Sequence, residues 1–390
     1  MRIVDICEQT ISVSRYEYAT PEAGGLTTSL VSVTTDAVRN GRPVVGYGFA
    51  SVGRYGQGGL IRERFAPRLL AAGVRQLTSS AGDNLDPPAC WTVMMAGEKP
   101  GGHGERCVAV GTLDMAIWDA AAKIAGSPLC TFIRSRLGMD DRLPSRVPVY
   151  AGGGYLYAEN DLERLSDEIR RFVALGFTHA KIKIGATDLS ADLRRVDVAA
   201  RILGAETRLA VDAMNVYTPD KAPAVAAALA GRRLWWLEDP CDPLDFETQA
   251  RVADLCPFPI AVGEALFSLA EAKLLHRHGG LRRDRDILVF DPVHCYGLTA
   301  YLQIVDWLLA NGWRRNAFWP HGGSLFCQHI VAALELGGAE INPQAFAPFR
   351  GLAEGQTLAD GVVSLPEVDG IGFESHREIW AALGPIRRDN

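Results

Sequence analysis

Several signatures that would place the protein in a common functional class are missing from its sequence. No uninterrupted apolar run approaches the roughly 20 residues that span a membrane, and the start MRIVDICEQTISV lacks the charged and apolar segments of a secretory signal. The eight cysteines are dispersed, with neither a C-x-x-C pair nor zinc-like spacing. We therefore expect a cytoplasmic protein with reduced thiols and no membrane partner.

Signals for nucleic acids, nucleotides and two hydrolase classes are also missing. The 40 Lys and Arg residues are outnumbered by 46 Asp and Glu residues and form no basic run, so no nucleic-acid partner is indicated. The glycine-rich stretch PGGHGER, residues 100–106, follows no clear strand and precedes no G-K-[ST], which favours a structural turn over a phosphate loop. The absence of G-x-S-x-G and H-E-x-x-H removes the usual serine hydrolase and zincin signatures.

The chain that remains is long enough for two domains. Residues 1–130 have an α+β pattern, with an N-terminal strand, strands at TTSLVSVTTDAV and PVVGYGFAS, and then helices. The clearest helix begins at Val108 and is expected to end at Gly126, which suits a C-cap. The tail, about residues 365–390, fits no later repeat and is expected to return to this first domain.

Residues 145–360 alternate short apolar strands with amphipathic helices, which indicates successive βα units and a parallel sheet. Eight units favour a closed (β/α)8-type barrel over an open sheet. The candidate strands are VPVYAGGG, HAKIKIG, RLAVDAMN, LWWLEDP, FPIAVGE, DILVFDPV, NAFWPHGG and a weaker one near AEINP.

A polar residue ends each of five successive strands, where barrel enzymes carry their catalytic groups. These residues are Asp212, Glu238, Glu264, Asp291 and His321. A single acid in such a place is usually a helix N-cap, but three carboxylates on consecutive strands would repel one another unless a cation bridges them. Because all-oxygen ligands suit a hard ion, the pattern predicts Mg²⁺.

The strand HAKIKIG carries two lysines on one face, Lys181 and Lys183. A solvated edge strand would explain a lone K-x-K. Beside a metal centre, Lys183 could instead remove the α-proton of a chelated carboxylate while Lys181 stays cationic, favours a neutral neighbour and helps hold that carboxylate. His321, paired with Asp291, would act from the opposite side, which suits either racemisation or β-elimination of water.

This order of residues resembles the mandelate racemase subgroup of the enolase superfamily. The stretches VGYGF, GRYGQGGLIRERFA, AGDNLDP, EKPGGHGER, DMAIWDA and GIGFE are further similar to the D-tartrate dehydratases of that subgroup. The resemblance implies a modified (β/α)7β barrel under an α+β capping domain. It also implies a role for each site residue: Asp212, Glu238 and Glu264 as Mg²⁺ ligands, Lys183 as base, His321 as acid assisted by Asp291, and Lys99, Tyr155 and Glu340 around the substrate.

Departures from that pattern concern the substrate pocket. Ala50 and Val52 replace expected asparagines, Tyr18 replaces another polar contact, and Leu156 follows Tyr155. Met214 also occupies a position where the family more often carries asparagine. A less polar wall leaves substrate hydroxyls unpaired, so we expect weak turnover of D-tartrate.

The sequence thus predicts a homo-oligomeric, Mg²⁺-dependent dehydratase that converts a small-molecule carboxylate, an acid sugar or hydroxy (di)acid, into a 2-keto acid through an enediolate. A racemase or epimerase using the same Lys/His pair remains open, as does a non-catalytic metal-binding descendant. The roles of His103 and His294 are left open.

Overall fold

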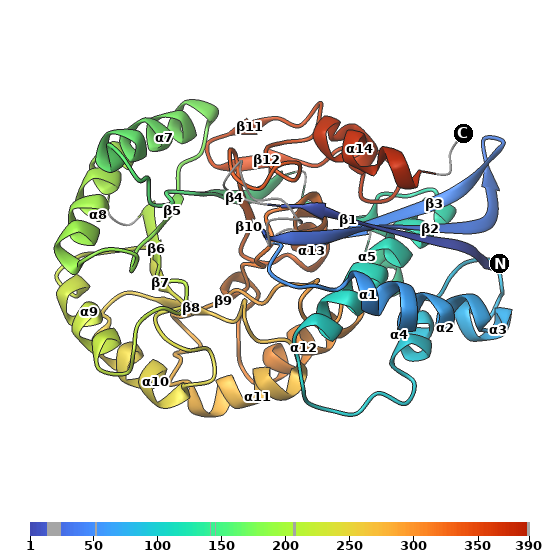
Figure 1. Cartoon of the computed structure of the whole chain (residues 1–390), viewed down its shortest axis with the longest axis horizontal. Helices are drawn as coiled ribbons and strands as arrows, with labels where there is room; N and C mark the ends of the chain where they lie inside the picture. The colour runs from blue at the N-terminus through green and yellow to red at the C-terminus, as the bar shows by residue number, and fades with distance from the viewer. Residues whose placement is uncertain (14–24, 51–52, 141, 145, 206–207, 388–390) are drawn as a thin grey trace.

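The computed structural model describes residues 1–13, 25–50, 53–140, 142–144, 146–205 and 208–387. Its elements form an α/β barrel of parallel strands, on the left of Figure 1, and an antiparallel sheet with helices, on the right. Within the described ranges, none of the helices is long and apolar enough to cross a membrane.

The first group is an α+β cap built on a three-stranded sheet. Strands β1 (Ile3–Ser12), β2 (Thr27–Arg39) and β3 (Arg42–Phe49) pair antiparallel in that order, at the three predicted places. Helix α5 (Glu105–Ala125) packs so closely on β3 that a Cβ at Gly46 would lie 1.9 Å from the Ala116 carbonyl oxygen. This helix begins before the predicted Val108 and is capped, as predicted, by Gly126 at a φ of 67°.

Shorter helices complete the cap. They are α1 (Gly58–Leu60), the π-helical turn η1 (Ile61–Phe65), α2 (Ala66–Ala71), α3 (Val74–Leu77), α4 (Pro87–Met95) and α6 (Leu129–Arg136).

The barrel follows as alternating parallel strands and outer helices (Figure 1). Its strands are β4 (Arg146–Gly152), β5 (Ala180–Lys183), β6 (Leu209–Asp212), β7 (Trp236–Glu238), β8 (Ile260–Val262), β9 (Ile287–Leu288) and β10 (Ala339–Ile341). Its helices are α7 (Asp161–Leu175), α8 (Leu189–Leu203), α9 (Lys221–Leu229), α10 (Phe246–Leu255), α11 (Leu269–His278), α12 (Leu298–Ala310) and α13 (Leu325–Leu334). Strand β10 pairs with β4, as expected for the last strand of a closed barrel.

The seventh predicted strand, NAFWPHGG, is wrong as a regular strand. Residues Arg315–Ala317 form a 3₁₀ turn, η3, and the segment joins the sheet by one bridge between Phe318 and Leu288. Pro320 lacks a ladder donor, and Gly322 and Gly323 have positive φ, so a longer strand cannot form here. Hydrogen bonds from Trp319 N to Leu288 O and from Gly337 N to Phe318 O still hold the segment between its neighbours.

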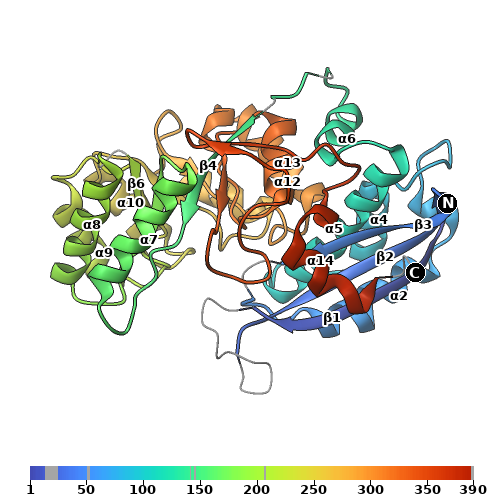
Figure 2. The same cartoon turned by 90° about the horizontal axis from the view of Figure 1, so that it is seen from above.

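The C-terminal part runs back over the cap, as Figure 2 shows for helix α14 (Arg377–Leu383). The Ser32 hydroxyl donates to the Ile386 carbonyl oxygen, and the rings of Trp380 and Tyr47 meet edge to face. Before it, the hairpin β11 (Leu358–Ala359) and β12 (Val362–Ser364) adds to the edge of β4. The predicted domain boundaries themselves stay a prediction.

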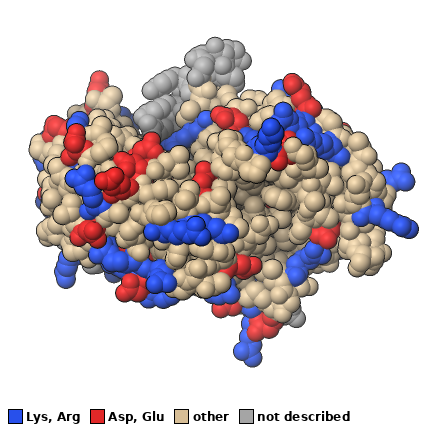
Figure 3. Space-filling view, turned by 90° about the horizontal axis from the view of Figure 1, so that it is seen from below, with Lys and Arg blue, Asp and Glu red and all other residues tan. Residues whose placement is uncertain are grey.

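The buried cysteines carry free thiols. Acidic and basic side chains of the described residues are interspersed over the face shown in Figure 3, with wide uncharged areas between them.

Candidate active site

Three buried carboxylates meet at the carboxyl end of the barrel strands. Asp212 and Glu238 are the last residues of β6 and β7 and are register neighbours, and Glu264 follows β8. One ligand atom from each of the three lies within 4.8 Å of the others. The structure therefore brings together the three residues that were predicted as metal ligands.

The chemistry of this cluster fits Mg²⁺, because three enclosed oxygen donors suit a small hard cation. Burial raises the pKa of Glu238 to about 7, whereas the nearby lysines outweigh burial at Asp212 and lower the pKa of that carboxyl. Carboxylates held so close together in a dry site need positive charge beside them. Asp212, Glu238 and Glu264 would hold the ion.

Lys181 and Lys183 supply positive charge from β5, and both are buried. The Lys181 ammonium donates to Glu238 and lies 3.5 Å from Asp212 Oδ2, whereas Lys183 donates to Asp212. The alternative of a solvated edge strand is therefore wrong. Burial alone lowers the pKa of Lys183, but attraction to Asp212 and Tyr155 outweighs it and raises the pKa overall. The sequence led us to expect a neutral Lys183 beside a cationic Lys181, but the raised pKa favours the protonated form of Lys183. A metal ion bound to Asp212 would weaken the attraction between Asp212 and Lys183.

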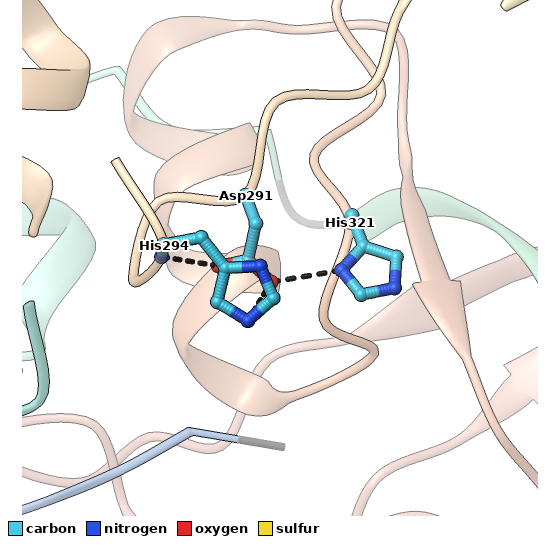
Figure 4. A group of neighbouring side chains, drawn as sticks. All are labelled: Asp291, His294 and His321. Atoms are coloured by element: carbon cyan, nitrogen blue, oxygen red, sulfur yellow. Dashed lines mark hydrogen bonds and ion pairs between the residues drawn. The ribbon is translucent and has the colours of Figure 1, made fainter. Parts of the chain in front are cut away.

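His321 and Asp291 form the predicted pair (Figure 4). His321 Nδ1 is 2.8 Å from Asp291 Oδ2, and Nε2 is 3.3 Å from Glu264 Oε2. Backbone N–H groups of Val293 and His294 hold the other Asp291 oxygen. Although burial lowers the pKa of His321, Glu264 and Asp291 outweigh it and raise the pKa to about 9.

His294, left open by the sequence, lines this site. Its Nε2 lies 3.6 Å from the same Asp291 oxygen that faces His321, and its ring meets Tyr55 edge to face. Among the described residues neither of its ring nitrogens has a hydrogen-bond partner, and burial lowers its pKa. His103 lies elsewhere, where its Nδ1 contacts the Tyr296 hydroxyl.

Two of the three predicted substrate residues lie at this site. The Lys183 ammonium lies 5.3 Å from the centre of the Tyr155 ring, and Glu340, on β10, has an oxygen 3.7 Å from the Lys181 ammonium. Lys99 is exposed between α4 and α5, and no hydrogen bond or ion pair found among the described residues joins its side chain to the cluster.

The residues expected to make the pocket less polar are only partly brought together. Leu156 lines a pocket with residues of α7 and α8. Ala50 is buried and accepts the Thr28 hydroxyl on its carbonyl. Tyr18 and Val52 lie outside the described residues. The predicted weak turnover of D-tartrate stays a prediction.

Two contacts to the carboxylates were missed from the sequence. Arg54, in the loop after β3, places Nη1 3.1 Å from Glu264 Oε1. The indole N–H of Trp236 donates to Glu238 Oε2 over 2.8 Å. The contact of Trp236 could have been predicted from the sequence, because Trp236 precedes Glu238 by two positions and its side chain therefore lies on the same face of the strand.

A family comparison agrees with this geometry. The family model described as Enolase C-terminal domain-like matches residues 164–379, more than half of the chain. The chain belongs to this family. The resemblance to the enolase superfamily seen in the strand-end residues is thereby confirmed, as is the modified barrel with its N-terminal cap.

Individual members of the enolase superfamily extend this result. Arabinonate dehydratase from Saccharolobus solfataricus is 30% identical over 279 residues, covering 70% of this chain and 71% of its own. A 3,6-anhydro-alpha-L-galactonate cycloisomerase from Streptomyces coelicolor is 31% identical, covering 72% of each chain. The crystal structure of L-talarate dehydratase from Polaromonas sp. JS666, complexed with Mg and L-glucarate, is 25% identical with a TM-score of 0.72, covering 95% of this chain and 94% of that one.

Proposed function

We propose that the protein is a Mg²⁺-dependent dehydratase that removes water from an acid sugar or small hydroxy (di)acid and yields a 2-keto acid. The observation that carries the proposal is the arrangement of Lys183 and His321 on different sides of one carboxylate cluster, Lys183 at Asp212 and His321 at Glu264. Relatives that dehydrate acid sugars, and one solved with Mg and L-glucarate, support it.

The roles of the residues follow from their surroundings. When bound, Mg²⁺ would acidify the α-proton of a carboxylate substrate by stabilising the developing negative charge. Lys183 removes that proton once it has lost its own to solvent, and Lys181 remains cationic beside Glu238 and Glu340. His321 enters the reaction protonated and donates to the departing β-hydroxyl, while Asp291 orients the imidazole through Nδ1.

Dehydration and racemisation require different work from the same two residues. In a dehydratase, only Lys183 acts on the α-carbon and His321 acts on the leaving group. In a racemase, each residue serves one face of the α-carbon, and no water is lost. Because one relative is a cycloisomerase, a cycloisomerase product is a third outcome that the assay should detect.

The deciding experiment is proton exchange in D₂O, followed by NMR, on a substrate found by screening acid sugars and hydroxy diacids. Lys183→Met should abolish both α-exchange and dehydration. His321→Asn should keep exchange, because Lys183 still removes the proton, while dehydration falls by about 10²-fold, the usual loss for a positioned acid. Lys221→Met, at an exposed position at the start of α9, is the matched control and should leave both rates unchanged.

Two results would contradict the proposal. Exchange that becomes specific for one enantiomer in each variant, with no keto-acid product, would support the racemase. Product that forms by ring opening or closure without loss of water would support a cycloisomerase.

A further inference from the structure

Two adjacent residues of the loop after β3, Arg54 and Tyr55, connect the cap to the mouth of the barrel. Arg54 contacts Glu264, which follows β8, with 3.1 Å between Nη1 and Oε1. The ring of Tyr55 meets Phe267 and His294 edge to face, with centroid distances of 5.7 and 5.1 Å. Because both neighbours of Tyr55 belong to barrel loops, this pair of contacts fixes Arg54 beside the carboxylate cluster.

The Arg54 side chain has unused hydrogen-bonding capacity at this position. A guanidinium group has five N–H donors in a planar fork that fits a carboxylate, and one bond, to Glu264, is made among the described residues. The side chain is also 41% exposed. Part of the Arg54 side chain is therefore accessible beside the carboxylate cluster.

The other cations of the site differ from Arg54 in this respect. Lys181 and Lys183 are buried and donate to Glu238 and Asp212. His321 is buried between Asp291 and Glu264. These three cations are buried among carboxylates of the protein, whereas Arg54, which also pairs with Glu264, is partly exposed at the edge of the same site.

The ion pair with Glu264 does not account for Arg54 by itself. Solvent weakens the pair on the Arg54 side, where the side chain is 41% exposed, and the buried Glu264 already faces the His321 imidazole 3.3 Å away. Glu264 is in addition one of the three residues that would hold the metal. When Glu264 binds the metal, Arg54 can therefore turn to an incoming anion with little loss of binding energy.

We infer that Arg54 is a specificity-determining residue that binds a second carboxylate of the substrate, so the enzyme acts on diacids in preference to monoacids. This inference rests on the proposed function, in which the first carboxylate occupies the metal centre. A substrate whose far end is a neutral hydroxymethyl group would offer the guanidinium no second carboxylate, and Arg54 would keep Glu264 as its partner.

The test uses the full-length enzyme with Mg²⁺ and a panel of four- to six-carbon acid sugars, in which each diacid is matched by the monoacid of the same configuration. We expect kcat/KM to be higher for the diacid of the preferred pair. Arg54→Met should lower kcat/KM for that diacid by about 10²-fold, mainly through KM, and leave the monoacid within about threefold. Arg54→Lys should recover part of the loss, because it keeps the charge without the fork.

Binding separates this inference from the chemistry. In the Lys183→Met background, calorimetry with the same pair should give tighter binding of the diacid, and adding Arg54→Met should remove the difference. Arg64→Met, which removes an exposed arginine from an ion pair with Glu98, is the control and should change neither substrate.

The outcomes distinguish the role of Arg54 from the proposed dehydratase activity. Equal loss for diacid and monoacid would overturn the assignment, because Arg54 would then contact a group common to both. Turnover of monoacids alone would overturn the diacid preference while leaving the dehydratase proposal intact. Failure of the whole panel to bind would overturn the proposed function and the inference with it.

Discussion

At the scale of single residues, aromatic side chains contact the carboxylate cluster. Tyr150, Trp235, Trp236 and Trp319 form a buried or partly buried cluster inside the barrel. From this cluster the Trp236 indole donates to Glu238 Oε2, while Lys181 donates to the other oxygen of the same carboxylate. Both oxygens of Glu238 are thus oriented by buried donors, which limits the rotation of the carboxylate.

Replacing Trp236 with Phe should therefore weaken Mg²⁺ binding. The ring and most of its packing remain, but the N–H that orients Glu238 is lost, and losing such an indirect partner of a metal usually costs about 10- to 100-fold in affinity. Calorimetric titration of the apo enzyme with Mg²⁺ measures this directly.

Trp319→Phe provides the control from the same cluster. Its indole N–H donates to the Asn316 carbonyl rather than to a metal ligand, so Mg²⁺ affinity should stay within about threefold of the parent. Equal weakening in both variants would mean that packing of the cluster, not the hydrogen bond to Glu238, controls the affinity.

The central residues of the site could be predicted because they follow a regular pattern. Asp212, Glu238 and Glu264 end consecutive strands, and parallel strands bring their ends together whatever the loops do. Arg54 could not be found in this way, because its contact with Glu264 spans two groups of elements that no local pattern connects. Lys99 was assigned by resemblance alone, and the structure leaves it exposed.

At the scale of elements, helix α5 joins the cap to barrel helix α12 through a buried carboxyl, Asp114. Both Asp114 oxygens accept hydrogen bonds from Thr299 of α12, one from the hydroxyl and one from the backbone N–H. Asp114 is fully buried, and burial raises its pKa to about 7 despite these bonds. Because the unfolded chain ionises near the usual value, this carboxyl favours folding most at low pH, and the benefit is lost as the pH rises toward 7.

Asp114→Asn should remove this pH dependence. Relative to the parent, the free energy of unfolding of the variant should rise by about 2 kcal/mol between pH 5 and pH 8, since the amide has no proton to lose. Denaturant unfolding at the two pH values measures the difference. The same substitution at exposed Asp254 on α10 should show no such change. A constant difference for Asp114→Asn would show that the carboxyl is ionised in the folded protein at both pH values.

Helices and strands could be predicted where one local pattern in the sequence determines them. The cap strands and α5 have strong periodicity, and Gly126 marks the helix end as it does in the structure. The segment NAFWPHGG has the apolar composition of a strand, but Pro320 and the left-handed Gly323 prevent a continuous ladder. The apolar composition of the segment does not show that Pro320 lacks the backbone N–H that a strand ladder needs.

At the scale of the whole molecule, the metal should contribute to both activity and stability. EDTA should abolish turnover, and Mg²⁺ should restore it. Mg²⁺ at about 100 times its dissociation constant should also stabilise the fold by about 2.7 kcal/mol, visible as a higher melting temperature. Asp212→Asn should remove most of that increase. Full activity in enzyme shown by elemental analysis to be metal-free would contradict the metal site.

The close contact of α5 with the barrel also bears on how such enzymes can be recombined. A Cβ at Gly111 would lie 1.8 Å from the carbonyl oxygen of Val293, in the turn that carries Asp291 and His294. Helix α5 therefore packs directly against the turn that carries Asp291, which orients the proposed acid. A chimaera that exchanges the entire cap would also replace this contact. Transplants intended to alter substrate choice should therefore keep α5 with its own barrel and replace only the loop that bears Arg54.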